Sequence, residues 1–414
     1  MSRPAIRFSD LRGIGRLAGD ATTGITDLVE AMHHTIVRTP GILGKPPSGR
    51  TRGITGLVYG TVRGVTKLVG GGIDALLGRL DAMVGERPSS PERDAVLAAL
   101  NGVLGDYLES SGNPLATPMR LRSAGAPLAL SKAALAAAFP QPARHVIVLV
   151  HGLCMNDLQW TRHGHDHGAA LARDLGCVPL YLHYNTGRHL STNGRDFADL
   201  METLAREWPC AIEQLTIVGH SMGGLVARSA CHYATLAGHA WVRRLDRMVF
   251  LGTPHLGSPM ERAGTQADFL IELSPYSAPF ARLGKVRSAG IRDLGHADLR
   301  DEDWHASAAV RARRASVGLP AGVRCYAMAA SRQERPSPSG AKPRGDRLVT
   351  VDSALGRSAN PARDLGLPEA RSWVGYGMGH FDLLDRAEAY ERLRRWIADD
   401  AAARSRRAGR AYAE

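Results

Sequence analysis

The stretch from Ile217 to Ser229, IVGHSMGGLVARS, constrains the fold of this chain more than any other part of the sequence. Apolar, β-branched residues run up to Gly219, and apolar residues at helical spacing follow Gly223. This change of period predicts a strand, a sharp turn and a helix. Glycines two residues before and two residues after Ser221 let the strand and the helix approach each other closely. We therefore expect the Ser221 hydroxyl to lie at the carboxyl end of a buried strand.

Apolar, β-branched runs alternate with helical segments through most of the chain. This alternation predicts an α/β fold, in which crossover helices join the strands of a mostly parallel sheet. A pair of short strands at 119–130, MRLRSAGAPLAL, is expected to form a hairpin before them. In such sheets the chemistry takes place at the carboxyl ends of the strands. The expected parallel strands are HVIVLVHG, VPLYLHYN, LTIVGHS, MVFLGTPH and VRCYAMAAS.

A serine hydroxyl is a weak nucleophile, and it needs a base, usually a histidine that a carboxylate orients. In this topology the chain order is serine, acid, histidine. His380 follows a short β-type run in a glycine-rich loop, so we expect it to be the base. We favour Asp346 as the acid, because it lies in a glycine-flanked loop just beyond the last strand of the alternating series. Asp352 is the alternative acid, although it could instead cap the helix that follows.

Acyl transfer also needs hydrogen-bond donors for the oxyanion that develops on the substrate. The first expected donor is the backbone amide of Met222, directly after the serine. The second is the backbone amide of Leu153, because His151-Gly152 ends an earlier strand and the glycine lets the backbone approach a substrate. We therefore expect Leu153 and Met222 to form the oxyanion hole.

Five motifs in this order resemble the α/β-hydrolase superfamily, and within it the lipase and GPI-inositol-deacylase-like branch. The likeness extends from about Asp94 to Trp396, and the motifs that carry it read VLVHGL, VGHSMGGLVAR, LGTPHLGSPMER, GDRLV and GHFDLL. The resemblance implies that Ser221 is the nucleophile, Asp346 the acid and His380 the base. It also implies an acyl-ester substrate and no cofactor. The sequence departs from the family at Arg347, which stands where the family usually has the second glycine of G-D-G.

The sequence predicts three parts. Residues 1–87 form an amphipathic helical segment, followed by a linker rich in proline and serine, ERPSSPE. Residues 88–400 form the catalytic domain, with a small cap at about 264–320, and residues 401–414 form a basic tail. The cap is expected because this material exceeds what the sheet needs and because lipase-like members of the superfamily carry one.

The N-terminal segment has apolar residues eleven positions apart, a period that keeps an apolar stripe on one side of a long helix. The opposite face bears glycine, threonine and basic residues, and residues 1–87 contain 12 lysines and arginines against 7 aspartates and glutamates. Such a helix can lie on a lipid surface, as in apolipoproteins and lipid-droplet coat proteins, whose repeat this one resembles. The alternative is a helical hairpin packed on protein, because Gly56, Gly60 and Gly64 suit close helix contact. The stripe comprises Ile14, Leu17, Ile25, Leu28, Ile36, Ile54, Val58, Val62, Val65, Val69, Ile73, Leu76, Leu80 and Val84.

Composition narrows the class of partner. The formal net charge of +12 favours anionic surfaces, but no nucleic-acid-binding motif is present, so we expect no specific nucleic acid. The five cysteines are widely spaced and odd in number, which is typical of free thiols in a reducing compartment. The N-terminus has no secretory leader pattern and the chain has no transmembrane stretch, so we expect a cytoplasmic protein, peripheral at most on a lipid surface.

One histidine-rich run, HGHDHG at 163–168, raises the question of a metal site. Its spacing is not that of a structural zinc site, and Asp166 is well placed to cap the helix that follows. We therefore expect a loop near the active site and no bound metal.

The resulting hypothesis is a serine carboxyl-ester hydrolase of lipase or esterase type that works through an acyl-enzyme. One alternative is a depolymerase that uses the same three residues on a stored polyester at a granule surface. A second alternative, of a different class, is a lipid-surface coat or interaction protein in which the hydrolase domain is secondary.

Overall fold

The computed structural model describes residues 7, 9–23, 91–258, 287–307, 310–311, 314–336 and 343–398. The chain divides into two compact units. Residues 1–93 and 108–116 belong to the first unit, and residues 94–107 and 117–414 to the second. The expected boundary at 87–88 and the expected tail at 401–414 lie outside the described residues.

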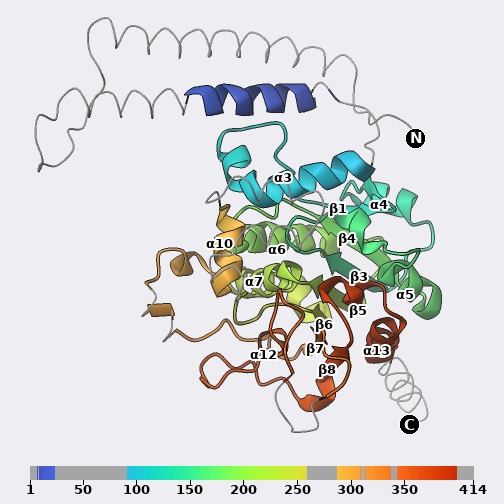
Figure 1. Ribbon diagram of the computed structural model, residues 1–414. Coiled ribbons are helices and arrows are strands. Elements are labelled where there is room, and N and C mark those ends of the chain that lie inside the picture. The colour runs from blue at the N-terminus through green and yellow to red at the C-terminus, as the bar shows by residue number, and fades with distance from the viewer. Residues whose placement is uncertain are drawn as a thin grey trace, which may run out of the picture. The chain divides into compact units, whose positions relative to one another are not determined.

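In the first unit a helix spans 9–23, the blue helix of Figure 1. Asp10 forms an ion pair of 2.5 Å with Arg93, and an added Cβ at Gly13 would lie 2.2 Å from Leu115, so this glycine permits a close approach. Leu11 and Ile14 remain 43% and 57% exposed. The main run of the predicted 11-residue repeat, Ile54 to Val84, lies outside the described residues.

The second unit is built on one eight-stranded sheet with the order β2-β1-β4-β3-β5-β6-β7-β8. β1 and β2 form an antiparallel hairpin, β1 pairs antiparallel with β4, and the remaining neighbours are parallel. The predicted hairpin and parallel sheet are thus confirmed. The strands are β1 Arg120–Ser123, β2 Ala126–Pro127, β3 His145–Val150, β4 Val178–His183, β5 Gln214–His220, β6 Leu245–Leu251, β7 Arg324–Ser331 and β8 Ser372–Tyr376.

Helices cover both faces of the sheet (Figure 1). α6 and α7 pack on each other over one face, where Phe197 and Leu225 join the apolar cluster of Val148. α5 and α13 cover the other face, where Leu171 and Leu393 cluster with Leu149. Successive residues of β3 therefore point to opposite layers, as the strand period requires. The helices are α3 Pro91–Ser110, α4 Lys132–Ala138, α5 His167–Leu175, α6 Leu190–Glu207, α7 Met222–Ala237, α10 Ala289–His296, α12 Val351–Ala354 and α13 Ala387–Ala398.

Two local expectations need correction. The predicted linker reaches too far, because Pro91 begins α3; proline suits the first position of a helix, where its missing N–H costs nothing. Asp352 does not cap the short helix α12. Thr350 is the N-cap, and its hydroxyl accepts a hydrogen bond from the Ser353 amide, so Asp352 lies in the first turn.

The described part of the expected cap region begins at 287 and contains α10 and the short 3₁₀ helix η4, Asp301–Asp303. Ser288 caps α10, and its hydroxyl donates a hydrogen bond of 2.6 Å to the carbonyl of Gly102 in α3. The Gly290 amide donates to the carbonyl of Gly187 at 2.9 Å. α10 is thereby fixed to the body of the second unit, whereas residues 264–286 lie outside the described residues.

No helix in the described ranges has the length and apolarity to cross a membrane.

Four buried histidines of the second unit are neutral in the folded protein, which makes the free energy of unfolding depend on pH. Burial lowers the pKa of His151 to about 3 and of His167 to about 4, and it lowers the pKa of His220 and His255 well below the usual value. His167 begins α5 and donates a hydrogen bond of 2.9 Å from Nε2 to the carbonyl of Leu383. An unfolded chain binds protons on these side chains near pH 6.5, so acid favours unfolding.

We predict that the free energy of unfolding falls as the pH is lowered from 7 to 5. For His167 the stabilisation is present above pH 6.5 and is lost as the pH falls toward about 4, its pKa in the folded protein. Urea unfolding at several pH values measures this loss. In His167→Gln the slope should decrease by up to about 1.4 kcal/mol per pH unit. His305→Gln, which changes an exposed side chain, is the matched control. An unchanged slope in His167→Gln would contradict the prediction.

Candidate active site

Ser221 stands on the turn between β5 and α7, at the carboxyl edge of the sheet. Its φ of 52° and ψ of −126° lie in a region that costs a residue with a side chain about 1–3 kcal/mol. The Ser221 amide donates to the carbonyl of Leu251 at 2.9 Å, which ties the turn to the end of β6. An added Cβ at Gly223 would lie 2.1 Å from the carbonyl oxygen of Val150, and one at Gly219 would lie 2.6 Å from the Cα of Gly224. Both glycines are therefore needed for this close packing.

His380 and Asp346 form a buried hydrogen-bonded pair close to this edge. His380 follows β8 and begins the 3₁₀ helix η6, His380–Leu384, and its Nδ1 lies 2.8 Å from Asp346 Oδ2. The other oxygen of Asp346 accepts hydrogen bonds from the amides of Leu348, at 3.0 Å, and Val349, at 2.8 Å. His380 and Asp346 are only 4% and 2% exposed. The carboxylate is thus held by the backbone and can in turn orient the imidazole.

The Asp346 carboxylate determines which nitrogen of His380 carries the proton. An ionised carboxylate only accepts hydrogen bonds, so Nδ1 of His380 donates and Nε2 of the neutral ring is left as the acceptor. Nε2 is buried and has no hydrogen-bond partner among the described residues. It is therefore not hydrogen-bonded to Ser221 in this structure. Asp352, the alternative acid, lies in the first turn of α12, and the Nδ1 hydrogen bond goes to Asp346 instead.

The His220 ring and two glycines lie beside Ser221 or His380 and allow the two residues to approach each other. The His220 ring lies 4.8 Å from the His380 ring, centroid to centroid, and its Nε2 lies 3.4 Å from the His380 carbonyl oxygen. Gly252 follows β6 with a φ of 60°, and an added Cβ there would lie 3.0 Å from His380 Cε1. An added Cβ at Gly152 would lie 3.0 Å from the Cβ of Ser221. The ends of β3, β5 and β6 therefore converge with His380 in a space that larger side chains would block.

Leu153 and Met222 flank the serine from the ends of two neighbouring strands. Leu153 follows β3, and Met222 is the first residue of α7. β3 and β5 are adjacent and parallel, with Val150 opposite Gly219, so the two strands end at the same level. No described residue accepts a hydrogen bond from the Leu153 amide. Both residues are buried, at 1% and 0% exposure.

Sequence reasoning assigned no role to the loop after β4, although it predicted that strand. Thr186 in this loop accepts a hydrogen bond of 3.2 Å from the amide of Cys154, the residue after Leu153. Cys154 has a φ of 57°, which is unusual for a residue other than glycine. The signal available in the sequence was that Thr186 lies three residues beyond the carboxyl end of a predicted parallel strand. The contact itself depends on the tertiary fold.

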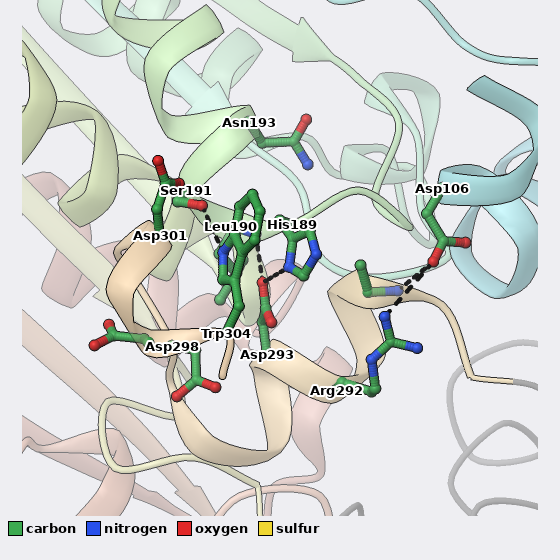
Figure 2. Close-up of polar contacts among 12 residues, drawn as sticks. Asp106, His189, Leu190, Ser191, Asn193, Arg292, Asp293, Asp298, Asp301 and Trp304 are labelled. Atoms are coloured by element: carbon green, nitrogen blue, oxygen red, sulfur yellow. Dashed lines mark hydrogen bonds and ion pairs between the residues drawn. The ribbon is translucent and has the colours of Figure 1, made fainter. Parts of the chain in front are cut away.

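Figure 2 shows how the loop after β4 is held from its other side. Asp293 of α10 accepts a hydrogen bond of 2.9 Å from the Leu190 amide and lies 2.9 Å from Nδ1 of His189. The His189 ring stacks on Trp304 with centroids 3.8 Å apart, and the Trp304 indole donates to Ser191 at 2.9 Å. Burial is the largest influence on Asp293 and raises the pKa of its carboxyl. The start of α6 and the loop before it are thus fixed to α10 and η4.

A cleft of about 430 Å³ opens beside His380 and Asp346. Arg162, Arg332 and Phe381 are among its lining residues, and the Arg162 guanidinium lies 5.2 Å from the centroid of the Phe381 ring. The cleft therefore lies on the side of the acid–base pair, and its lining does not include Ser221.

The histidine-rich run at 163–168 lies near this cleft. Asp166 caps α5 as predicted, because its side chain accepts a hydrogen bond from the Ala169 amide. His163 pairs with Asp385, and His165 Nε2 lies 2.7 Å from His167 Nδ1. In the part of the chain that the structure describes, no group of three or more His, Cys, Asp or Glu side chains is arranged to hold a metal ion.

The five cysteines are free thiols.

Residues 141–316 match the family described as "PGAP1-like alpha/beta domain". Similar solved structures include the mature lipase BlEst2 of Bacillus licheniformis, 19% identical over 59% of this chain and 88% of its own, with a TM-score of 0.37. The hyperthermophilic esterase of Pyrobaculum calidifontis is 14% identical over 80% of this chain and 97% of its own, with a TM-score of 0.41. No curated protein matches the chain significantly. Residues 141–316 are thus similar to a PGAP1-like α/β domain, and the second unit has the mostly parallel, helix-covered sheet of an α/β fold.

Proposed function

We propose that this protein is a serine carboxyl-ester hydrolase in which Ser221 is the nucleophile, His380 the base and Asp346 the acid. The main support is the buried hydrogen bond of 2.8 Å between His380 and Asp346, at the sheet edge where Ser221 occupies a strained turn. Two backbone amides hold the second oxygen of Asp346. Such an arrangement fits an acid that orients a base without becoming protonated itself.

The proposed reaction has two steps. Ser221 Oγ attacks the acyl carbonyl carbon, its proton passes to His380 Nε2, and the alcohol leaves with that proton as the acyl-enzyme forms. Water then attacks the acyl-enzyme, giving its proton to His380, and the carboxylic acid departs as Ser221 regains a proton. The amides of Leu153 and Met222 stabilise the oxyanion in both steps. A small shift of His380 brings Nε2 within hydrogen-bond reach of Ser221, as catalytic contacts often tighten only with substrate bound.

Substitution of the two candidate acids distinguishes their roles. Asp346→Asn should lower kcat for a short, water-soluble p-nitrophenyl ester by roughly 10⁴, because an amide in place of the carboxylate favours the wrong tautomer of His380. Asp352→Asn, the matched control, should change kcat by less than about tenfold. Circular dichroism confirms that both variants fold. A larger loss in Asp352→Asn than in Asp346→Asn would reverse the assignment of the acid.

We further propose that Thr186 positions the oxyanion hole through Cys154. Its hydroxyl accepts a hydrogen bond from the Cys154 amide. In this proposal that contact holds the turn so that the Leu153 amide faces Ser221. Thr186→Val keeps the shape of the side chain but removes the acceptor. It should lower kcat by roughly 10-fold to 100-fold with little change in KM, because the oxyanion donor acts mainly in the transition state.

Thr186→Ser, which keeps the hydroxyl, should restore kcat. Thr235→Val is the matched control, because Thr235 makes its hydrogen bond within α7, to the carbonyl of Cys231. Affinity for a trifluoromethyl ketone, whose adduct carries the oxyanion, should fall in Thr186→Val together with kcat. A purely structural role would instead raise KM or lower the melting temperature in both Thr186 variants and leave relative inhibitor affinity unchanged.

We propose that the substrate is lipid-like and that the first unit helps to reach it at a lipid surface. The exposed apolar side chains of Leu11 and Ile14 on the helix 9–23 support this proposal. An apolar helix face binds a lipid interface through burial of such side chains, and the net charge of the chain favours anionic lipid.

Ile14→Asp should weaken binding to vesicles that contain anionic lipid and should leave hydrolysis of a short soluble ester unchanged. Thr23→Asp is the matched control, because it adds the same charge on the opposite face of the helix from Ile14. Vesicle sedimentation and pH-stat assays on emulsified ester measure the two effects. Equal binding by Ile14→Asp and wild type would contradict a role of this face in lipid contact.

A further inference from the structure

The guanidinium of Arg228 is buried without a carboxylate. Arg228 lies in α7, seven residues beyond Ser221, and is 1% exposed. One amino group lies 3.1 Å from His255 Nδ1, and the other donates to the carbonyl of Val317. Nε has no hydrogen-bond partner among the described residues. Burial lowers the pKa of Arg228 to about 10, a value at which the group still carries its charge at neutral pH.

Arg247 is another buried arginine, and it has a carboxylate partner. It lies in β6 and is fully buried, and its guanidinium forms an ion pair of 2.7 Å with Asp246. A buried charge is costly unless an opposite charge accompanies it. Arg247 has such a partner, whereas no described carboxylate forms an ion pair or hydrogen bond with Arg228.

The hydrogen bond from Arg228 leaves His255 with a buried N–H group that can donate to a ligand. An arginine can only donate, so Nδ1 of His255 accepts and Nε2 of the neutral ring carries the hydrogen. Burial lowers the pKa of His255, which keeps the ring neutral. His255 Nε2 is also buried without a hydrogen-bond partner in the described ranges. Arg228 and His255 therefore offer two buried N–H groups that lack an acceptor.

Both residues line a small cavity with an excess of positive charge. Four of its lining side chains are arginines, and Asp303 is its one acidic lining residue among those described. Asp303 already forms ion pairs with Arg300 and Arg314. Asp298, labelled beside α10 in Figure 2, pairs with Arg311 and Arg314. The lining arginines are Arg228, Arg300, Arg314 and Arg363.

The size of the cavity limits what it can hold. The space open to the centre of a water-sized sphere is about 10 Å³, enough for one monatomic ion or one water molecule. A phosphate or a carboxylate ligand is too large for this volume. A water molecule fits, but it brings no negative charge to balance Arg228.

We propose that this cavity is a binding site for one chloride-sized halide ion, which accepts hydrogen bonds from Arg228 and its neighbours. The ion would link α7, which carries the turn of Ser221, to the loop after β6 that contains His255. Thr253 of the same loop packs against this helix, because an added Cβ at Gly224 would lie 2.1 Å from the Thr253 hydroxyl. Bound halide would therefore stabilise the folded protein. The proposal does not depend on the proposed hydrolase activity.

Thermal unfolding of the full-length protein tests for this ion. Chloride and gluconate salts of sodium are compared at one pH and at about 0.15 M ionic strength, where both screen surface charges over about 8 Å. Ligand bound only by the folded state raises stability, so the melting temperature should be about 2 °C or more higher in chloride. In Arg228→Met this difference should disappear. Arg247→Met, the matched control, should keep it, because Arg247 has a carboxylate partner of its own.

Crystals of the wild-type protein grown in sodium bromide give a direct readout that does not require a folded variant. We expect an anomalous difference peak inside the cavity, beside Arg228. A cavity without this peak, which would then hold water, overturns the proposal. A chloride effect of equal size in wild type and Arg228→Met also overturns it, because the effect would then arise elsewhere.

Discussion

The second unit depends on the close approach of α7 to the ends of β3 and β5. An added Cβ at Gly223 would lie 2.1 Å from the carbonyl oxygen of Val150, so the helix can begin where it does only without that side chain. The same approach forces Ser221 to a φ of 52° and places it where three parallel strands end. The strain is localised at one residue and is offset by the extensive burial of α7 against the sheet.

The remaining parts of the candidate site reach this edge because they follow strands that end there. His380 follows β8 and Asp346 follows β7, and in the folded chain they meet across 34 residues of sequence. Burial removes water from this pair, which strengthens its electrostatic interaction. Around it the protein uses neutral histidines, such as His151 and His220, whose burial lowers their pKa values. The acid–base pair is thus buried at one edge of the sheet. His380 Nε2 is the imidazole nitrogen there that the proposed chemistry uses.

Much of this arrangement follows from local sequence patterns. The period of two in HVIVLV and the glycines around Ser221 depend on neighbours in sequence, so the strands and the turn could be predicted. Sequence favoured Asp346 over Asp352 only because Asp346 is nearer the end of the strand that both follow, and the folded loop determines which one meets His380. Thr186 and the Arg228–His255 pair were missed for a related reason: their partners are 32 and 27 residues away in sequence, and no local period marks such contacts.

The central claim is that Ser221 is an activated nucleophile served by His380 and Asp346. Incubation with a fluorophosphonate followed by peptide mass spectrometry tests it most directly, because this reagent forms a stable adduct only with a serine whose proton is removed by a nearby base. The account predicts one adduct, on Ser221, that is absent in Ser221→Ala and forms much more slowly in Asp346→Asn. An unlabelled Ser221 in folded wild-type protein, or an adduct on another serine, would contradict it.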